Sequence, residues 1–203
     1  MKQLNMNKIL NFAIYIYENV EVLDFAGPFE VFSTAGRFIN TDKKPNVFLV
    51  AEEQVTVSAR GGLGINPNYC ISKHPDVDVL IIPGGIHNEE MKKQNVLNWI
   101  NNQSEQVNLV ASVCTGAFLL AEAKVLTNQK VTTHWEDIPE LRKNYPNLTV
   151  LENQRWIDQE KFITSAGISA GIDMSLYIVS QIYGIQIAEK TARQMEYDWI
   201  KTS

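Results

Sequence analysis

Cys114 is the residue of this sequence best suited to covalent chemistry, and it stands in Ser112-Val113-Cys114-Thr115-Gly116. Small residues two positions before and after it form the pattern of a nucleophile elbow, in which a strand turns directly into a helix. At such a turn the helix dipole and free backbone N–H groups favour a thiolate. The pattern therefore predicts a nucleophilic Cys114 with a strained backbone and a depressed pKa. The alternative is a buried, inert cysteine, because free cysteines are often buried.

The remaining cysteine and the three histidines indicate no second reactive centre. Cys70 has neither the elbow pattern nor an adjacent glycine, so we interpret it as structural. His74 and His87 lie in polar loop contexts and are expected to be solvated. Together with His134 they are too scattered for a metal site, since no carboxylate cluster accompanies them.

Pro83-Gly84-Gly85 closes a strongly apolar segment. Adjacent glycines allow backbone N–H groups to face a ligand at close range, which suits an oxyanion hole. A plain turn is the alternative, because glycine pairs are common in loops.

The elements that must position these residues alternate along the chain. Apolar β-type segments at 9–17, 46–51, 77–82 and 107–113 predict buried strands. Helices are expected at 28–37, opened by Gly27-Pro28, and at 89–102, 117–124, 135–144, 170–183 and 187–200. Shorter extended pieces are expected at 130–133, 149–151, 155–158 and 162–165, with a hairpin or irregular extension at 56–66. This alternation predicts an α/β fold with a mainly parallel sheet and helices on both faces, whose site lies at the carboxyl ends of the strands.

Length and charge limit the classes of function. A chain of 203 residues suits one domain, here 1–203, and its formal net charge of −5 offers no footprint for nucleic acid or an anionic membrane. The N-terminal apolar run is short and lacks a cleavage site, so no signal or anchor is expected. Two cysteines cannot form a disulfide framework, which favours a reducing cytoplasm over secretion.

Several blocks together give the sequence a family resemblance. They are Val22-Leu23-Asp24-Phe25-Ala26-Gly27-Pro28, Leu80-Ile81-Ile82-Pro83-Gly84-Gly85, Ala111-Ser112-Val113-Cys114-Thr115-Gly116-Ala117, Thr132-Thr133-His134-Trp135 and Thr164-Ser165-Ala166-Gly167. With these blocks the chain resembles the ThiJ/PfpI superfamily from about Leu10 to Trp199. It is most similar to the isocyanide hydratase branch and to the amidotransferase-like domains of AraC-type regulators.

The resemblance implies a flavodoxin-like sandwich of the class I glutamine amidotransferase type, with the nucleophile at Cys114. It implies an acid at Asp24, in the first strand–helix loop, that hydrogen-bonds the sulfur and manages a proton. Backbone N–H groups at Gly85, beside Gly84, and at Thr115 would stabilise negative charge, and His134 is a possible pocket residue. The Trp135 ring is expected to pack in the core, with the pocket or the dimer face as alternatives. The resemblance also suggests a homodimer and a small-molecule substrate, and it implies no metal or organic cofactor.

One departure from the family pattern bears on the reaction. Protease-like members carry His directly after the cysteine, whereas this chain has Thr115, so peptidase activity is not expected. The leading hypothesis is a hydratase acting on a small electrophile, with isocyanide hydration to a formamide as the concrete version. The alternatives are glyoxalase- or deglycase-type activity on small dicarbonyls, and a non-enzymatic ligand-binding or redox-sensing module.

Overall fold

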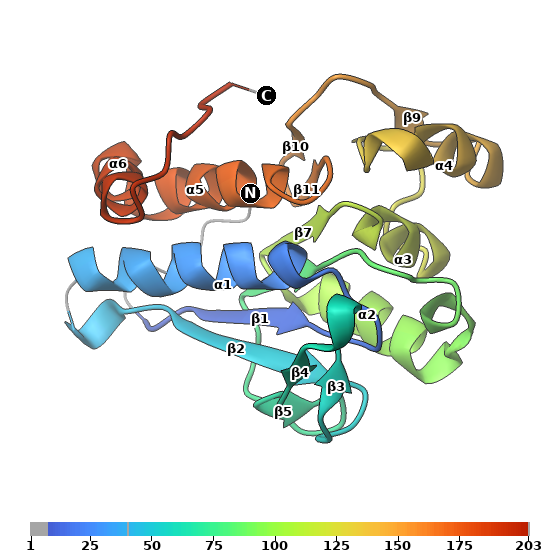
Figure 1. Cartoon of the computed structure of the whole chain (residues 1–203), viewed down its shortest axis with the longest axis horizontal. Helices are drawn as coiled ribbons and strands as arrows, with labels where there is room; N and C mark the ends of the chain where they lie inside the picture. Colours follow the sequence, from blue (N-terminus) through green and yellow to red (C-terminus); the bar gives the residue numbers. More distant parts are fainter. Residues whose placement is uncertain (1–7, 40, 203) are drawn as a thin grey trace.

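A seven-stranded sheet lies at the centre of the computed structural model, which describes residues 8–39 and 41–202 (Figure 1). Its strands are β1 (Asn11–Tyr15), β2 (Asn46–Ala51), β5 (Tyr69–Cys70), β6 (Val79–Ile82), β7 (Leu109–Val113), β10 (Trp156–Gln159) and β11 (Phe162–Ser165), in the order β10-β11-β7-β6-β1-β2-β5. All neighbours are parallel except β10 and β11. The mainly parallel α/β fold expected from the sequence is thus confirmed.

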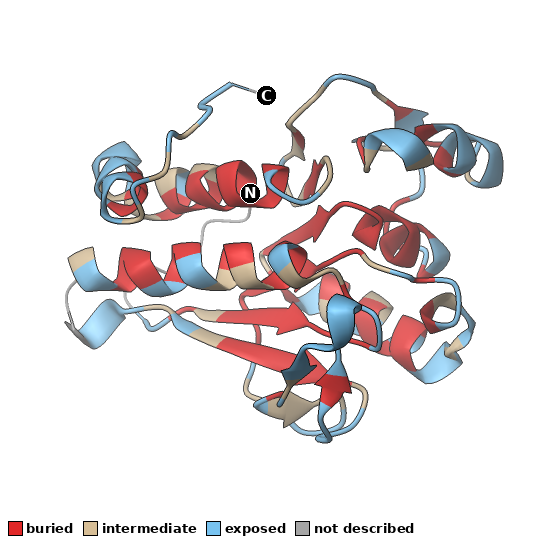
Figure 2. Cartoon of the chain, viewed as in Figure 1, coloured by how far each residue is buried: buried red, intermediate tan, exposed pale blue. Residues whose placement is uncertain are grey.

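Helices cover both faces of this sheet, as the apolar strands require. Phe12 of β1 stacks on Phe32 of α1 (Val22–Ala35), whereas Tyr15, on the opposite face of the same strand, contacts Trp99 of α2 (Gln94–Gln106). Helices α1, α5 (Ala170–Tyr183) and α6 (Ile185–Gln194) pack together on one side (Figure 1). Strands β6 and β7 are buried at every position (Figure 2).

The remaining elements lie around the edges of the sheet. Helix α3 (Gly116–Glu122) follows β7, and α4 (Ile138–Asn144) packs beside the small parallel pair β8 (Lys130–Val131) and β9 (Thr149–Val150). Strands β3 (Val57–Ser58) and β4 (Gly64–Ile65) form an antiparallel hairpin inside 56–66, as expected. Short 3₁₀ turns occupy Gly36–Phe38, Thr41–Lys43, Arg60–Gly62, Glu90–Lys92 and Trp135–Asp137. Among the residues the structure describes, no helix is both long and apolar enough to cross a membrane.

Several helix boundaries differ from the sequence prediction, and the helix expected at 89–102 is a 3₁₀ turn (Glu90–Lys92) followed by α2 (Gln94–Gln106). The first helix begins at Val22, so Pro28 lies inside it and Asp24 belongs to its first turn rather than to a loop. The close packing of α1 on α5, where a Cβ on Gly27 would lie 3.0 Å from Ile172 Cγ1, holds this buried helix despite its proline.

The last helix ends at Gln194 instead of continuing to Ile200. Glu196 adopts φ +50, a left-handed conformation that terminates helices. Beyond it, the Ile200 N–H donates to Asp173 Oδ1 at 3.0 Å and draws the chain back onto α5. Asp173 is buried in the first turn of α5 and also pairs with Arg155.

Candidate active site

Cys114 occupies the sharp turn between β7 and α3 with φ +56, so the strained elbow predicted from its neighbours is present. The residue is 7% exposed, and its N–H donates to the carbonyl of Ala166 at 3.2 Å. A Cβ at Gly116 would lie 2.0 Å from the carbonyl oxygen of Ile82. Only glycine fits there, because the start of α3 presses against the end of β6.

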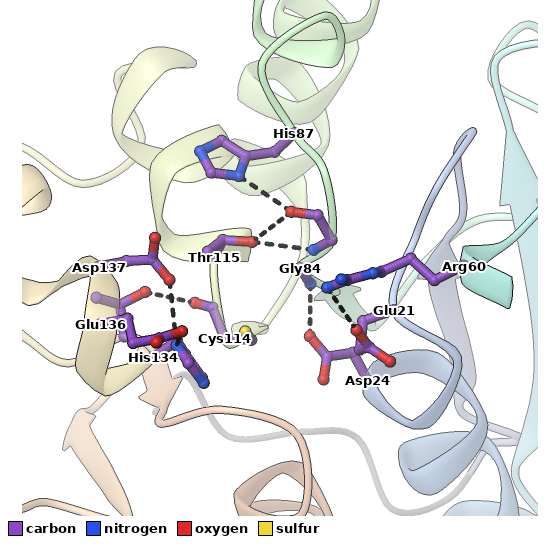
Figure 3. Close-up of polar contacts among 12 residues, drawn as sticks. Glu21, Asp24, Arg60, Gly84, His87, Cys114, Thr115, His134, Glu136 and Asp137 are labelled. Carbon is purple, nitrogen blue, oxygen red and sulfur yellow. Dashed lines mark hydrogen bonds and ion pairs between the residues drawn. The ribbon is translucent and has the colours of Figure 1, made fainter.

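Asp24 reaches the same place from α1. Its side chain is fully buried, and Oδ2 accepts the N–H of Gly84 at 3.0 Å (Figure 3). The Cys114 thiol interacts with this carboxyl and lowers the pKa of Asp24. The structure therefore brings together the two side chains that the sequence analysis singled out for catalysis.

The environment of the pair shifts the pKa values of both groups upward. Burial raises the pKa of Asp24 from 3.8 to about 7, and the charge of Glu21 adds to this, against the opposing hydrogen bond from Gly84. Burial, followed by the charge of Asp24, raises the pKa of the Cys114 thiol far above its ordinary value, although the N–H of Thr115 lowers it. The depressed cysteine pKa expected from the helix N-terminus is therefore wrong: desolvation of a nearly enclosed sulfur outweighs the dipole of a seven-residue helix.

Gly84, Gly85 and Thr115 form a connected set, but not the expected oxyanion hole. The N–H of Gly84 donates to Asp24, and the N–H of Gly85 donates to Thr115 Oγ1 at 2.9 Å. Thr115 Oγ1 in turn donates to the carbonyl of Gly85 at 3.1 Å. Both glycine N–H groups thus position the side chains of Asp24 and Thr115, whereas the Thr115 N–H faces the Cys114 sulfur.

His134 lies on the other side of the Cys114 sulfur from Asp24 (Figure 3). The Nδ1 atom of His134 is 3.3 Å from Asp137 Oδ2, and a Cβ on Gly167 would lie 2.1 Å from the histidine ring. Within the described part of the chain, no hydrogen bond joins this imidazole to the Cys114 sulfur. Trp135 is 74% exposed and lines a cavity beside the site.

Sequence analysis missed one residue whose backbone faces both Asp24 and Cys114. The N–H of Ile168 lowers the pKa values of Asp24 and of Cys114, so it lies close to both. Ile168 adopts φ +51, which a β-branched residue rarely does. No sequence signal marks this position, because only the tertiary fold imposes the conformation.

The other histidines and Cys70 also have defined environments. His87 is buried rather than solvated: its Nδ1 lies 3.2 Å from the Gly85 carbonyl, and its ring packs on Phe118. His74 Nε2 accepts the indole N–H of Trp99 at 2.9 Å, so it too has a structural partner. Cys70 lies in edge strand β5 beside Ser72. In residues 8–39 and 41–202, no three His, Cys, Asp or Glu side chains gather closely enough to hold a metal ion.

Comparison with known families agrees with this architecture. The model of the DJ-1/PfpI family matches residues 11–181, and the chain belongs to this family. The chain is 30% identical over 190 residues to isonitrile hydratase of Pseudomonas putida, which covers 93% of the chain and 78% of that protein. A solved ThiJ/PfpI family protein from Pseudomonas syringae superposes with a TM-score of 0.84 at 25% identity, covering 98% of this chain and 79% of that one.

More distant relatives have different named roles. The HTH-type transcriptional regulator CdhR of Pseudomonas aeruginosa is 29% identical over 138 residues, which are 68% of the chain and only 41% of the regulator. A deglycase of Pyrococcus horikoshii is 24% identical over 134 residues, which are 64% of the chain and 76% of that protein. Family membership therefore defines the fold and leaves the reaction to be argued from the site.

Proposed function

We propose that this protein is an isocyanide hydratase, which adds water to an isocyanide and releases an N-substituted formamide. One observation carries the proposal: a fully buried carboxyl, Asp24, whose pKa is about 7, lies against the thiol of Cys114. Such a pair supplies a soft nucleophile and a proton donor active near neutral pH. Similarity to isonitrile hydratase supports the same choice of substrate.

The first half of the proposed reaction adds the S–H group across the isocyanide carbon. Asp24 takes the thiol proton as the sulfur of Cys114 attacks the terminal carbon, forming a C–S bond. The electron pair left on that carbon then takes the proton back from Asp24. The product is a thioimidate, R–N=CH–S–Cys114, and the Asp24 carboxylate is regenerated.

Water completes the cycle without expelling an amine. The Asp24 carboxylate takes one proton of the water as its oxygen bonds to the thioimidate carbon, and the nitrogen receives that proton. The C–S bond of the tetrahedral adduct then breaks, and the sulfur leaves with the proton of the new hydroxyl group. The sum is R–NC plus H₂O to R–NH–CHO, with the Cys114 thiol restored.

The same geometry argues against peptide hydrolysis. An amide loses its amine only when a positioned acid protonates the nitrogen, and serine and cysteine proteases use a histidine bound to the nucleophile for this step. Here Thr115 follows the nucleophile, and His134 is turned toward Asp137 instead. A carbonyl substrate is the second candidate, since similarity to a deglycase favours it and the same thiol and acid would add to a small dicarbonyl.

Three further properties belong to this proposal. The protein acts as a homodimer, as the family resemblance suggests, and size-exclusion chromatography with light scattering measures this directly. It needs no metal or organic cofactor, because the Cys114 thiol and one acid suffice for the steps above. It works in the reducing cytoplasm, where the catalytic cysteine stays a thiol.

The test is a substrate screen with isocyanides, methylglyoxal and small amides, followed by product identification. Wild-type protein, Cys114→Ala and Cys70→Ser are compared, the last as a control for the second thiol. We expect formamide production that Cys114→Ala abolishes and Cys70→Ser retains. Turnover of methylglyoxal without turnover of any isocyanide would replace the first candidate with the second.

A further inference from the structure

A cavity of about 610 Å³ is lined in part by Thr133 and Ala166, which both hydrogen-bond the backbone of Cys114. It opens between the 3₁₀ turn that precedes α4 and the loop that leads into β10. Thr132, Thr133, Trp135, Ile138, Arg155 and Ala166 are among the residues that line it. Its volume falls within the range of about 300–1,000 Å³ typical of small-molecule sites. Neither Cys114 nor Asp24 is among the residues that line it.

Direct contacts connect this cavity to the nucleophile. Thr133 Oγ1 donates to the carbonyl of Cys114 at 2.8 Å, and Ala166 accepts the Cys114 N–H at 3.2 Å. Asp137, which precedes the lining residue Ile138, is close enough for its charge to raise the pKa of Cys114. One wall of the cavity therefore packs directly against the backbone of Cys114.

The two charged side chains of the cavity lining are ion-paired, although the buried Nε atom of Arg155 has no hydrogen-bond partner among the described residues. Arg155 pairs with the buried Asp173, and Glu152 pairs with Arg142 at 2.5 Å. The hydroxyl groups of Thr132 and Thr133 both donate to backbone carbonyls. No charge in the lining is left to attract an ion, so the wall favours a neutral, mostly apolar group.

Trp135 supplies the distinctive feature of this wall. At 74% exposure it is the most exposed large apolar side chain in the described part of the chain, although burial of an indole is strongly favourable. Its ring packs on that of His134, with centroids 5.8 Å apart, and forms part of the cavity wall. An aromatic ligand would cover this surface by stacking.

We propose that this cavity is the subsite for the substituent on the substrate nitrogen, and that the substituent is a neutral aromatic ring stacked on Trp135. The inference rests on the proposed isocyanide chemistry for its substrate and adds the class of group that the substrate carries. The protein should then prefer an aryl isocyanide to methyl isocyanide, because only the aryl ring can stack on Trp135.

The experiment compares phenyl isocyanide with methyl isocyanide as substrates of four proteins: wild type, Trp135→Ala, Trp135→Phe and Ile86→Ala. Ile86 is an exposed apolar residue next to Gly85 and outside the cavity lining, so it serves as the matched control. Trp135→Ala should lower kcat/KM for phenyl isocyanide about three- to tenfold, the range expected for loss of one aromatic contact. It should leave methyl isocyanide within twofold, and Trp135→Phe should restore most of the aryl preference.

A binding measurement separates this inference from the proposed reaction. N-phenylformamide is titrated into Cys114→Ala protein, with and without Trp135→Ala, by calorimetry. Binding that requires Trp135 supports the subsite even if no isocyanide is turned over, in which case the proposed reaction alone fails. The subsite is overturned if Trp135→Ala lowers aryl and methyl turnover equally, or if N-phenylformamide does not bind. It is also overturned if Trp135→Ala changes only the oligomeric state, because a second copy of the chain then covers the indole.

Discussion

Replacing Asp24 with asparagine should stabilise the protein at pH 8 while removing its turnover. The carboxyl is fully buried, and burial is the main cause that raises its pKa from 3.8 to about 7. At about 1.4 kcal/mol per pH unit, this difference means that ionised Asp24 costs about 4 kcal/mol in the folded protein relative to the unfolded chain.

The sign of the pH dependence follows from proton binding. Between pH 3.8 and about 7 the folded protein holds the Asp24 proton more tightly than the unfolded chain does. The contribution of Asp24 to the free energy of unfolding is therefore fully present below pH 3.8 and is lost as the pH rises through about 7. Asparagine keeps an oxygen for the Gly84 N–H and never ionises, so the variant escapes this loss.

Urea denaturation at several pH values from 4 to 8 measures the effect. The unfolding free energy of the wild type minus that of Asp24→Asn should fall by up to about 4 kcal/mol from the acidic to the basic end. Asp42→Asn, at an exposed position, is the control and should track the wild type within about 0.5 kcal/mol. Parallel curves for the wild type and Asp24→Asn would show that no costly ionisation occurs at this position, and the assignment of Asp24 as the acid would lose its physical basis.

Other outcomes test the elbow, the acid and the reaction class. Gly116→Ala should lower the free energy of unfolding by at least about 3 kcal/mol, or Tm by roughly 6 to 12 °C, because its Cβ would meet the Ile82 carbonyl oxygen at 2.0 Å. Gly64→Ala is the control: its Cβ would meet only Thr56 Cγ2 at 3.5 Å, so this variant should melt like the wild type in the same thermal scan. For isocyanide hydration, kcat/KM should rise with pH through about 7, since attack requires the Asp24–Cys114 pair to have lost one of its two protons; a profile that falls from pH 6 to 8 would contradict this. Casein and dipeptide amides should remain uncut in a prolonged incubation, and sustained cleavage that Cys114→Ala abolishes would restore a peptidase.

The parts of the site that were predicted correctly depend on local sequence. The elbow follows from Ser112 and Gly116, because a strand that turns at once into a helix leaves no room for larger neighbours. Strands β6 and β7 follow from uninterrupted apolar runs, since both faces of the sheet are covered. These signals lie within a few residues of the structure that they specify.

The parts that were wrong depend on contacts between distant segments. Gly27-Pro28 is a reasonable helix start by local rules, yet packing on α5 extends the helix back to Val22 and carries Asp24 into it. The pKa of Cys114 is governed by burial under segments that include Asp24 and Ile168, which lie 90 and 54 residues away in the chain. The local sequence pattern predicts the effect of the helix dipole on Cys114, but it cannot predict the burial of the sulfur by these distant segments.

The raised pKa of Cys114 explains why the proposed reaction begins with proton transfer from the thiol to Asp24. Since both burial and the charge of Asp24 oppose a thiolate, sulfur becomes a strong nucleophile only when its proton has moved to Asp24. That transfer leaves the charge of the pair unchanged and puts the proton on the group that must next deliver it to carbon. An uncharged isocyanide with an uncharged substituent preserves this balance through every step, which is why a buried Asp24–Cys114 pair beside a wall whose charges are paired suits such a substrate.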